Sequence, residues 1–158
     1  MLESKVHLSQ MRIATKSSII DTTSKRQLEE FAIKVGAKIN QGDIFFLLGE
    51  MGVGKTSFVK YLINNLQKRF KEELTEVTSP TFNIMNEYKV KDLLIKHYDL
   101  YRIVSSNELK DLNLFDNRDN AILLIEWPEI IEKKPNSFIK FHFEYKNDYK
   151  NRSIKIIN

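Results

Sequence analysis

The chain has 158 residues, of which 42% are hydrophobic and 29% charged, and its 25 Lys and Arg against 21 Asp and Glu give a net charge of +4. The length favours one domain, and the mild basic excess tolerates an acidic partner such as RNA without requiring one. The absence of cysteine excludes disulfides and thiolate metal sites and permits a reducing compartment.

The first residues predict neither a membrane anchor nor a signal peptide. No run approaches the ~18 apolar residues of a membrane span, and the N-terminal stretch lacks the apolar centre of a signal sequence. We therefore expect a cytoplasmic protein without membrane contact. Residues 1–19 are expected to form an N-terminal extension or a first strand, with Met11 as an alternative start, and residues 20–158 to form the single domain.

The first predicted helix begins at a capping box. Ser24 followed by Gln27 is typical of a helix N-terminus, and Gly42 is predicted to end the helix. Apolar residues recur on one face at helical spacing: Leu28, Phe31, Ala32, Val35 and Ile39. The next run, IFFLL at 44–48, is wholly apolar, which favours a strand buried on both faces of a sheet.

The sequence GEMGVGKT at 49–56 matches the pattern G-x-x-x-x-G-K-[ST] between this strand and a second helix. Glycines let backbone amides approach phosphate oxygens, and the helix N-terminus adds its positive dipole end. Lys55 would bind the β- and γ-phosphates, and the Thr56 hydroxyl would coordinate Mg²⁺. The alternative is a glycine-rich turn with an incidental lysine, but three of the five glycines lie here. The helix has a buried stripe: Phe58, Val59, Leu62, Ile63, Leu66 and Phe70.

Residues 78–82, TSPTF, are predicted to be extended, because a proline disfavours helical backbone at the preceding residue. Two strands, 83–90 and 93–103, are predicted to follow, joined by a tight turn at residues 91–92. The hydroxyls of Ser79 and Thr81 would sense a γ-phosphate, as a switch segment does. An ordinary turn is the alternative.

The remaining elements complete an α/β pattern. Ser105 and Glu108 form a second capping box that would open a short helix near 109–114. AILLI at 121–125 is a second wholly apolar strand, and two late segments alternate with period two: 138–145 and 152–157. We therefore predict an α/β, P-loop NTPase-like fold, with a mixed sheet flanked by helices in a single domain.

Two acidic residues stand at predicted strand ends, where ligands bind in open α/β sheets. A phosphate-bound Mg²⁺ needs a carboxylate near the loop. Glu126 closes the apolar strand and is the stronger candidate metal ligand. Asp99 closes an alternating strand and is a second catalytic candidate, although it also fits a residue that only hydrogen-bonds the following turn.

Two further residues near these carboxylates leave alternatives open. With three histidines and no cysteine, a transition-metal site is not expected, and His97 is interpreted as structural or as supporting another site residue. Trp127 is the only tryptophan. It either packs over a nucleotide or shields the site from water.

Glycine usage narrows the class of nucleotide-dependent protein. Residues 55–158 contain no glycine, which excludes the D-x-x-G switch of GTPases and the L-S-G-G-Q signature of transporter ATPases. An N-K-x-D motif is also missing, which favours adenine over guanine. Small kinases usually carry a lid of arginines, whereas the six arginines here are scattered, at 12, 26, 69, 102, 118 and 152. A slow or partner-gated ATPase is favoured; the alternatives are a small-molecule kinase and a non-hydrolysing ATP-sensing module.

Taken in order, GEMGVGKTSF, SPTF, HYDLYR and LLIEWPE resemble the TsaE (YjeE) family of small bacterial ATPases. The resemblance spans roughly residues 20–157, and these elements together are specific to the family. It implies a Mg²⁺-dependent ATPase, with ATP and Mg²⁺ as cofactors, that assists threonylcarbamoyladenosine modification of tRNA. It also implies binding to a TsaD–TsaB heterodimer, hydrolysis that serves turnover rather than acyl transfer, and indirect or weak contact with tRNA.

The family's site residues carry over by position. Lys55, Asp99 and Glu126 would be catalytic, Thr56 and Glu126 would hold the metal, and Ser79 and Thr81 would form the switch. ATP contacts are expected from one set of residues: Thr23, Ser24, Glu50, Met51, Gly52, Val53, Gly54, Lys55, Thr56, Ser57, Trp127 and Arg152. Tyr101, Arg102 and the helix after Ser105 are candidates for the partner surface, although a structural role fits them equally well.

The chain departs from the usual family pattern at a few positions. The loop reads E-M-G-V where D-L-G-A is usual, Asn83 stands where a threonine is common, and Asn113 replaces a frequent glycine. None of these changes touches a side chain expected to bind phosphate or metal.

Overall fold

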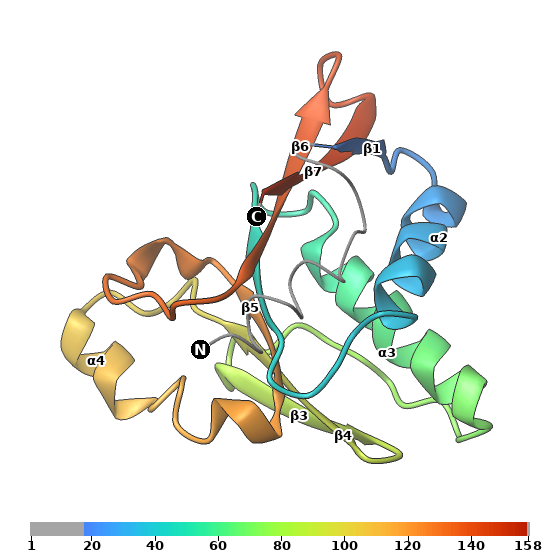
Figure 1. Ribbon diagram of the computed structural model, residues 1–158. Helices are drawn as coiled ribbons and strands as arrows, with labels where there is room; N and C mark the ends of the chain where they lie inside the picture. The colour runs from blue at the N-terminus through green and yellow to red at the C-terminus, as the bar shows by residue number, and fades with distance from the viewer. Residues whose placement is uncertain (1–17, 158) are drawn as a thin grey trace.

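The computed structural model describes residues 18–157. Its seven strands form one sheet in the order β1-β7-β6-β2-β5-β4-β3. Helices α2 and α3 lie together on one side of this sheet and α4 lies on the other (Figure 1). Of the extension or first strand predicted for residues 1–19, residues 1–17, with the alternative start at Met11 and with Arg12, lie outside the described residues.

The strands are β1 (Ile19–Asp21), β2 (Ile44–Leu48), β3 (Met85–Val90), β4 (Leu93–Asp99), β5 (Ile122–Glu126), β6 (Ile139–Lys146) and β7 (Asn151–Ile157). The helices are α2 (Lys25–Gly36), α3 (Lys55–Phe70) and α4 (Ser106–Asp111), with two short 3-10 helices, η1 (Arg118–Asn120) and η2 (Pro128–Ile130).

Strand β2 lies in the middle of the sheet and pairs in parallel with both β5 and β6. Strand β4 also pairs in parallel with β5, whereas β1, β3 and β7 pair antiparallel with their neighbours. The predicted α/β fold with a mixed sheet is therefore confirmed. Parallel pairing puts the carboxyl ends of β2, β5 and β4 at one edge, so the loop after β2 meets Glu126 and Asp99 there.

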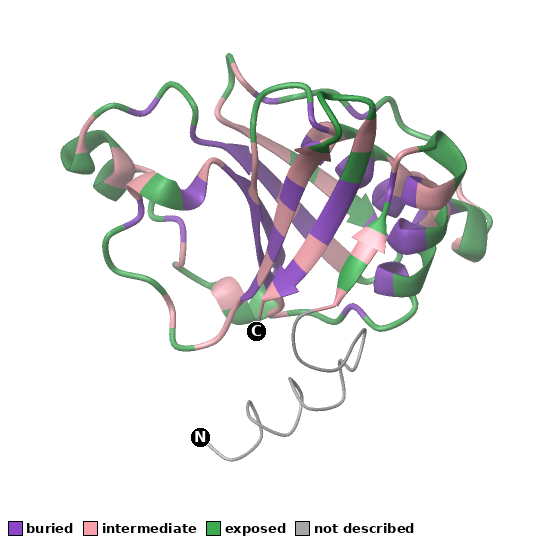
Figure 2. Cartoon of the chain, turned by 90° about the horizontal axis from the view of Figure 1, so that it is seen from above, coloured by how far each residue is buried: buried purple, intermediate pink, exposed green. Residues whose placement is uncertain are grey.

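The core has two layers, one on each face of the sheet. The predicted burial of β2 on both faces is confirmed, because Phe45 belongs to the cluster under α2 and α3 and Phe46 to the cluster on the α4 side. Three rings, Phe31, Phe58 and Phe141, pack with centroids 5.1 to 5.5 Å apart, at the distances that favour aromatic pairs. Figure 2 shows buried residues along the central strands and on the inner faces of the two helices.

Helix α2 begins as predicted and ends earlier. Both hydrogen bonds of the capping box at Ser24 are present. The helix ends at Gly36 rather than at Gly42, because the next residues make local bonds that compete with helix. The Asn40 amide donates to the Asp43 carboxylate at 2.7 Å, and the Asp43 amide donates to the Asn40 carbonyl at 3.1 Å.

The segment predicted to be extended is only partly so. Residues 81–83 form a turn, which the Ile84 amide closes by donating to the Pro80 carbonyl. Strand β3 therefore starts two residues later than predicted. Strand β4 ends at Asp99 rather than at residue 103, because the Asp99 carboxylate accepts a hydrogen bond from the Tyr101 amide and turns the chain.

The turn at residues 91–92 between β3 and β4 is confirmed. Helix α4 begins directly after its cap, Ser105, and so lies earlier than the predicted 109–114. Only half of the capping box forms. The Ser105 hydroxyl accepts from the Glu108 amide at 3.3 Å, but the Glu108 carboxylate accepts from the Val104 amide instead of the cap amide.

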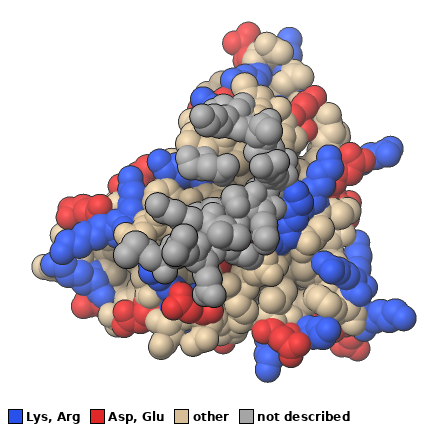
Figure 3. All heavy atoms as spheres, viewed as in Figure 1, with Lys and Arg blue, Asp and Glu red and all other residues tan. Residues whose placement is uncertain are grey.

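The surface carries charges of both signs. On the face shown in Figure 3, Lys and Arg side chains are interspersed with Asp and Glu. Arg26 pairs with Glu30 at 2.9 Å and Lys146 with Glu144 at 2.7 Å. Within residues 18–157, no helix is long and apolar enough to cross a membrane.

Phe141 and Phe82 form a matched pair for testing the core. Phe141 is fully buried among aromatic rings, whereas Phe82 is 80% exposed. Phe141→Ala should lower the free energy of unfolding by about 3–5 kcal/mol. Phe82→Ala should change it by about 1 kcal/mol or less. Urea unfolding of both variants measures the difference, and equal losses would contradict this core.

Candidate functional site

The glycine-rich loop, residues 49–54, joins the end of β2 to the start of α3. Its glycines all have positive φ: 137° at Gly49, 78° at Gly52 and 119° at Gly54. L side chains disfavour this region. A Cβ at Gly49 would also lie 2.5 Å from the carbonyl oxygen of Phe143 on β6, so only glycine fits there. The loop ends at the N-terminus of α3, where unpaired amides favour an anion.

Lys55 is a buried cation held by backbone and aromatic groups. Its Nζ donates to the carbonyls of Gly49 and Glu50 and lies 4.0 Å from the ring centroid of Trp127. No carboxylate within residues 18–157 forms an ion pair with it. Burial lowers the pKa of Lys55, while the charge of Glu126 acts in the opposite direction. A phosphate at this place would favour the charged ammonium further.

Glu126 is buried at the end of β5, and one of its carboxylate oxygens contacts two side chains. Its Oε1 accepts a 2.8 Å hydrogen bond from Thr56 Oγ1 and lies 2.8 Å from His97 Nε2. The sheet register sets Glu126 beside Leu47 of β2 and beside Asp99 of β4. Strand pairing and the first turn of α3 therefore bring the two predicted metal ligands together.

Asp99 is buried and ties the 79–81 segment to the end of β4. Its Oδ2 accepts from Ser79 Oγ at 2.9 Å and from Thr81 Oγ1 at 2.8 Å. Its Oδ1 accepts from the Tyr101 amide at 3.0 Å. This geometry matches the alternative in which Asp99 hydrogen-bonds the following turn, and it adds a tether to the predicted switch residues. A direct catalytic role for Asp99 stays a prediction.

One cavity of about 310 Å³ joins most of the predicted site. Its lining comes from the loop, the 79–81 segment and the strand ends: Met51, Gly52, Gly54, Lys55, Thr56, Ser57, Ser79, Thr81, Asp99, Tyr101, Glu126 and Trp127. The rings of Tyr101 and Trp127 lie 5.0 Å apart in its wall.

Tyr101, a candidate for the partner surface for which a structural role fitted equally well, was not predicted to line this cavity. Tyr101 lies two residues after the strand-end Asp99, and Trp127 lies directly after the strand-end Glu126. An aromatic residue within two positions of a strand-end carboxylate is the signal that would have identified Tyr101.

The remaining predicted ATP contacts lie outside this cavity: Thr23, Ser24, Glu50, Val53 and Arg152. Thr23 and Arg152 lie together, since the Arg152 amide donates to Thr23 Oγ1 at 3.0 Å. The Arg152 guanidinium lies 5.5 Å from the Tyr145 ring, and the Tyr145 hydroxyl would be 3.5 Å from a Cβ at Gly52. Tyr145 of β6 therefore lies near the loop, and Arg152 lies against the Tyr145 ring. Contact of the predicted residues with ATP stays a prediction.

The residues present fit a nucleotide with Mg²⁺. Among residues 18–157, no group of three or more His, Cys, Asp or Glu side chains is placed to hold a metal ion. Mg²⁺ is usually bound by one or two carboxylates together with phosphate oxygens and water. The Thr56 hydroxyl and the Glu126 carboxylate would supply such a partial set, and Lys55 would supply positive charge for the phosphates.

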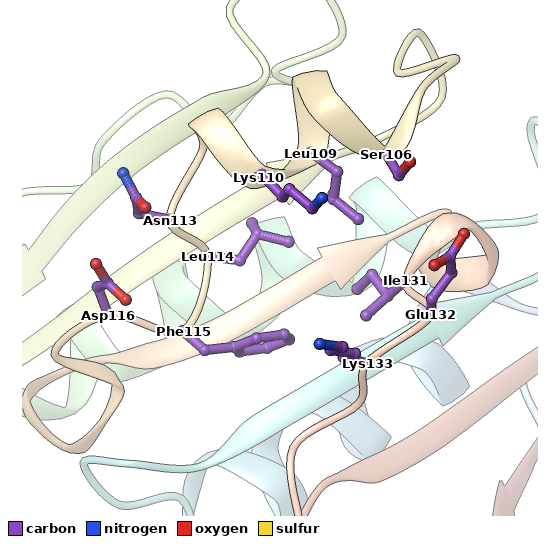
Figure 4. A pocket seen from close by; sticks show the side chains of 10 residues that line it. All are labelled: Ser106, Leu109, Lys110, Asn113, Leu114, Phe115, Asp116, Ile131, Glu132 and Lys133. Carbon is purple, nitrogen blue, oxygen red and sulfur yellow. The ribbon is translucent and has the colours of Figure 1, made fainter.

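A second cavity, of about 380 Å³, lies between α4 and residues 131–133. Leu109, Leu114, Phe115 and Ile131 give it an apolar wall (Figure 4). It contains none of the residues predicted to bind phosphate or metal. All the residues predicted to be catalytic, to hold the metal or to form the switch line the first cavity instead.

The sheet order and the loop define the class of protein: this is an α/β protein of the P-loop NTPase-like fold. A family model described as "Threonylcarbamoyl adenosine biosynthesis protein TsaE" matches residues 22–154. The chain belongs to the TsaE family, as the order of its motifs predicted.

Individual relatives agree with this assignment. The protein named "tRNA threonylcarbamoyladenosine biosynthesis protein TsaE" from Rickettsia prowazekii is 38% identical over 109 residues, which cover 69% of this chain and 73% of that protein. The protein of the same name from Rickettsia bellii is 34% identical over 141 residues, covering 89% and 94%. The crystal structure of YdiB from Bacillus subtilis matches with a TM-score of 0.68 at 23% identity, covering 90% of this chain and 86% of that one. This last match shows a shared fold.

Substitutions at Gly49 and Gly42 distinguish the cost of a side chain at positive φ from the cost of a steric clash. Both have positive φ, but a Cβ at Gly42 would meet nothing closer than 3.7 Å, whereas one at Gly49 would meet backbone at 2.5 Å. Gly42→Ala should cost about 1–2 kcal/mol of stability. Gly49→Ala should cost more and should also impair ATP binding, because the loop must move away from β6. Urea unfolding and calorimetric titration test this; equal behaviour of the two variants would contradict the packing constraint.

Proposed function

We propose that this protein is a Mg²⁺-dependent ATPase that supports threonylcarbamoyladenosine modification of tRNA in the cytoplasm and is activated by a complex of the TsaD and TsaB proteins. The observation that carries the proposal is the 2.8 Å hydrogen bond between Thr56 Oγ1 and Glu126 Oε1 beside the buried Lys55. A hydroxyl and a carboxylate held together next to a phosphate-binding loop are the protein ligands that a phosphate-bound Mg²⁺ requires.

Each part of the site has its own task in hydrolysis. The loop amides and Lys55 bind the β- and γ-phosphates. Thr56 and Glu126 hold Mg²⁺, which when bound stabilises negative charge on the transferring phosphoryl group. The Trp127 ring, 4.0 Å from Lys55 Nζ, and the neighbouring Tyr101 restrict access of bulk water to the phosphates.

The Asp99 tether supports gating by a partner. Ser79 and Thr81 line the cavity while their hydroxyls donate to Asp99. If the hydroxyl of Ser79 or Thr81 releases Asp99 and contacts a γ-phosphate instead, the adjoining 81–83 turn changes conformation. This turn contains Phe82, which is exposed at the surface. The state of the nucleotide and the shape of an exposed surface are thereby linked.

The role in tRNA modification rests on family membership rather than on charge. The lysines of residues 133–155 are interpreted as a solvated edge, and Lys146 there already pairs with Glu144. Charges of both signs are interspersed on the face shown in Figure 3. Contact with tRNA is therefore proposed to be indirect or weak, by way of the partner proteins.

A small-molecule kinase is less well supported. A kinase of this size would need cations to clamp a second substrate. Among the described residues, the arginines are Arg26, Arg69, Arg102, Arg118 and Arg152, and none lines the cavity. A module that binds ATP without hydrolysing it shares the binding site, and release of phosphate separates it from an ATPase.

Phosphate release from Mg²⁺-ATP tests the proposal directly. The purified protein should release phosphate slowly alone and faster with the TsaD–TsaB pair. Glu126→Ala should abolish release in both conditions while leaving the fold intact, because the metal loses its carboxylate. A rate of phosphate release that is the same with and without the TsaD–TsaB pair would contradict the role in tRNA modification. An unchanged rate in Glu126→Ala would show that Glu126 is not needed for hydrolysis.

Lys55 and Lys60 provide a matched pair on one helix. Lys55 is buried at the loop, and Lys60 is exposed one turn further along α3. Lys55→Ala should weaken ATP binding by about 1.5–3 kcal/mol, or roughly ten- to a hundredfold, because a charge-assisted contact is lost. Lys60→Ala should leave the affinity unchanged. Calorimetric titration measures both, and similar affinities would contradict the role of Lys55.

A further inference from the structure

His97 is a polar side chain at a position where an apolar one would pack. It is 0% exposed in β4, paired across from Asn86 of β3 and Leu124 of β5. Its neighbour two residues earlier, Ile95, belongs to the core under α2 and α3, so His97 points to that same face. Within residues 18–157, its Nδ1 has no hydrogen-bond partner. A buried polar atom without a partner is unfavourable, so the ring needs a compensating contact.

That contact is with Glu126. His97 Nε2 lies 2.8 Å from Glu126 Oε1. A carboxylate oxygen accepts hydrogen bonds, so Nε2 carries a proton and donates it to Glu126; this proton is assigned from the partner. Thr56 Oγ1 donates to the same oxygen. Two donors from two different elements, β4 and α3, therefore fix Oε1 of Glu126. Glu126 lines the cavity, and within residues 18–157 its other oxygen, Oε2, accepts no hydrogen bond.

We propose that His97 is a positioning residue, whose Nε2–H orients the Glu126 carboxylate and thereby sets the affinity of the site for Mg²⁺. The inference rests on the proposed function, because it assigns the metal to Glu126. Mg²⁺ demands near-ideal octahedral geometry, whereas Ca²⁺ accepts more variable ligands. A carboxylate fixed from two sides therefore favours Mg²⁺ over Ca²⁺, and His97 contributes to this selectivity.

Two substitutions of similar length isolate the hydrogen bond. His97→Gln keeps an N–H donor at the end of the side chain, and His97→Met removes it; both lose the ring, so the loss of packing is shared. The wild type and both variants are compared by the Mg²⁺ concentration that gives half-maximal ATP binding, read from Trp127 fluorescence, and by Mn²⁺ binding in electron paramagnetic resonance. ATP affinity in EDTA and thermal unfolding are measured alongside.

The expected pattern distinguishes positioning from stability. His97→Met should raise the half-maximal Mg²⁺ concentration about 10- to 100-fold, as the loss of a partner of a metal ligand does, while His97→Gln stays within roughly threefold of the wild type. The preference for Mg²⁺ over Ca²⁺ should narrow in His97→Met, and ATP affinity in EDTA should be the same in all three proteins. Equal shifts in both variants, or none in either, would overturn the role of His97.

A second measurement does not depend on the folding of a variant. Nitrogen-15 spectra of the wild type, which has three histidines, should show a proton on His97 Nε2. An Nε2 without a proton would overturn the inference. A failure of the proposed function gives a different result from a failure of the role of His97. In that case the wild type itself would show no Mg²⁺-dependent ATP binding.

Discussion

The parallel pairing of β2 with β5 is the constraint on which the site depends. In this register Leu47, the residue before the last of β2, lies beside Glu126, the last residue of β5. The loop that follows β2 leads into α3, whose first turn then places Thr56 within hydrogen-bonding distance of the carboxylate. Because side chains alternate along a strand, a slip of one residue would turn Glu126 to the α4 side of the sheet and away from Thr56. A slip would also exchange the residues that pack into the two core layers, such as Phe45 and Phe46, and would disrupt the packing of both.

Three charged groups of the site, Lys55, Asp99 and Glu126, do not form ion pairs with one another. Lys55 is held by two loop carbonyls and the Trp127 ring, Asp99 by two hydroxyls and an amide, and Glu126 by a hydroxyl and an imidazole. Buried charges normally pair with one another, because an isolated charge is costly away from water. Here each is oriented without being neutralised by its neighbour, an arrangement that suits a ligand carrying both negative phosphates and a divalent cation.

The parts of the site that could be predicted from the sequence are those set by local patterns. The apolar run 44–48 and the glycine spacing after it define a strand, a loop and a helix, and all three have the predicted order in the structure. Glu126 could be identified because a carboxylate ends a wholly apolar strand. The early end of α2 could not, because it depends on side-chain bonds between Asn40 and Asp43 that compete with the helix. The turn at 81–83 depends in the same way on one hydrogen bond, which the Ile84 amide donates to the Pro80 carbonyl.

Contacts between elements that are far apart in the sequence could not be predicted from local patterns. The His97–Glu126 contact depends on the register of β4 against β5, which periodicity alone does not set. The approach of Phe143 to Gly49 depends on β6 lying beside β2, although the two strands are far apart in the sequence. Thr23 and Arg152 are neighbours across 129 positions, and only the family resemblance suggested that they share a site.

The most direct test of the central claim is a crystal structure of the protein with a non-hydrolysable ATP analogue and Mn²⁺ in place of Mg²⁺, with the metal located by its anomalous scattering. The account predicts the triphosphate in the loop at 49–54 and the metal bound directly to Thr56 Oγ1, with Glu126 as a direct or water-bridged ligand. A triphosphate bound elsewhere, or a metal that contacts neither Thr56 nor Glu126, would contradict the account.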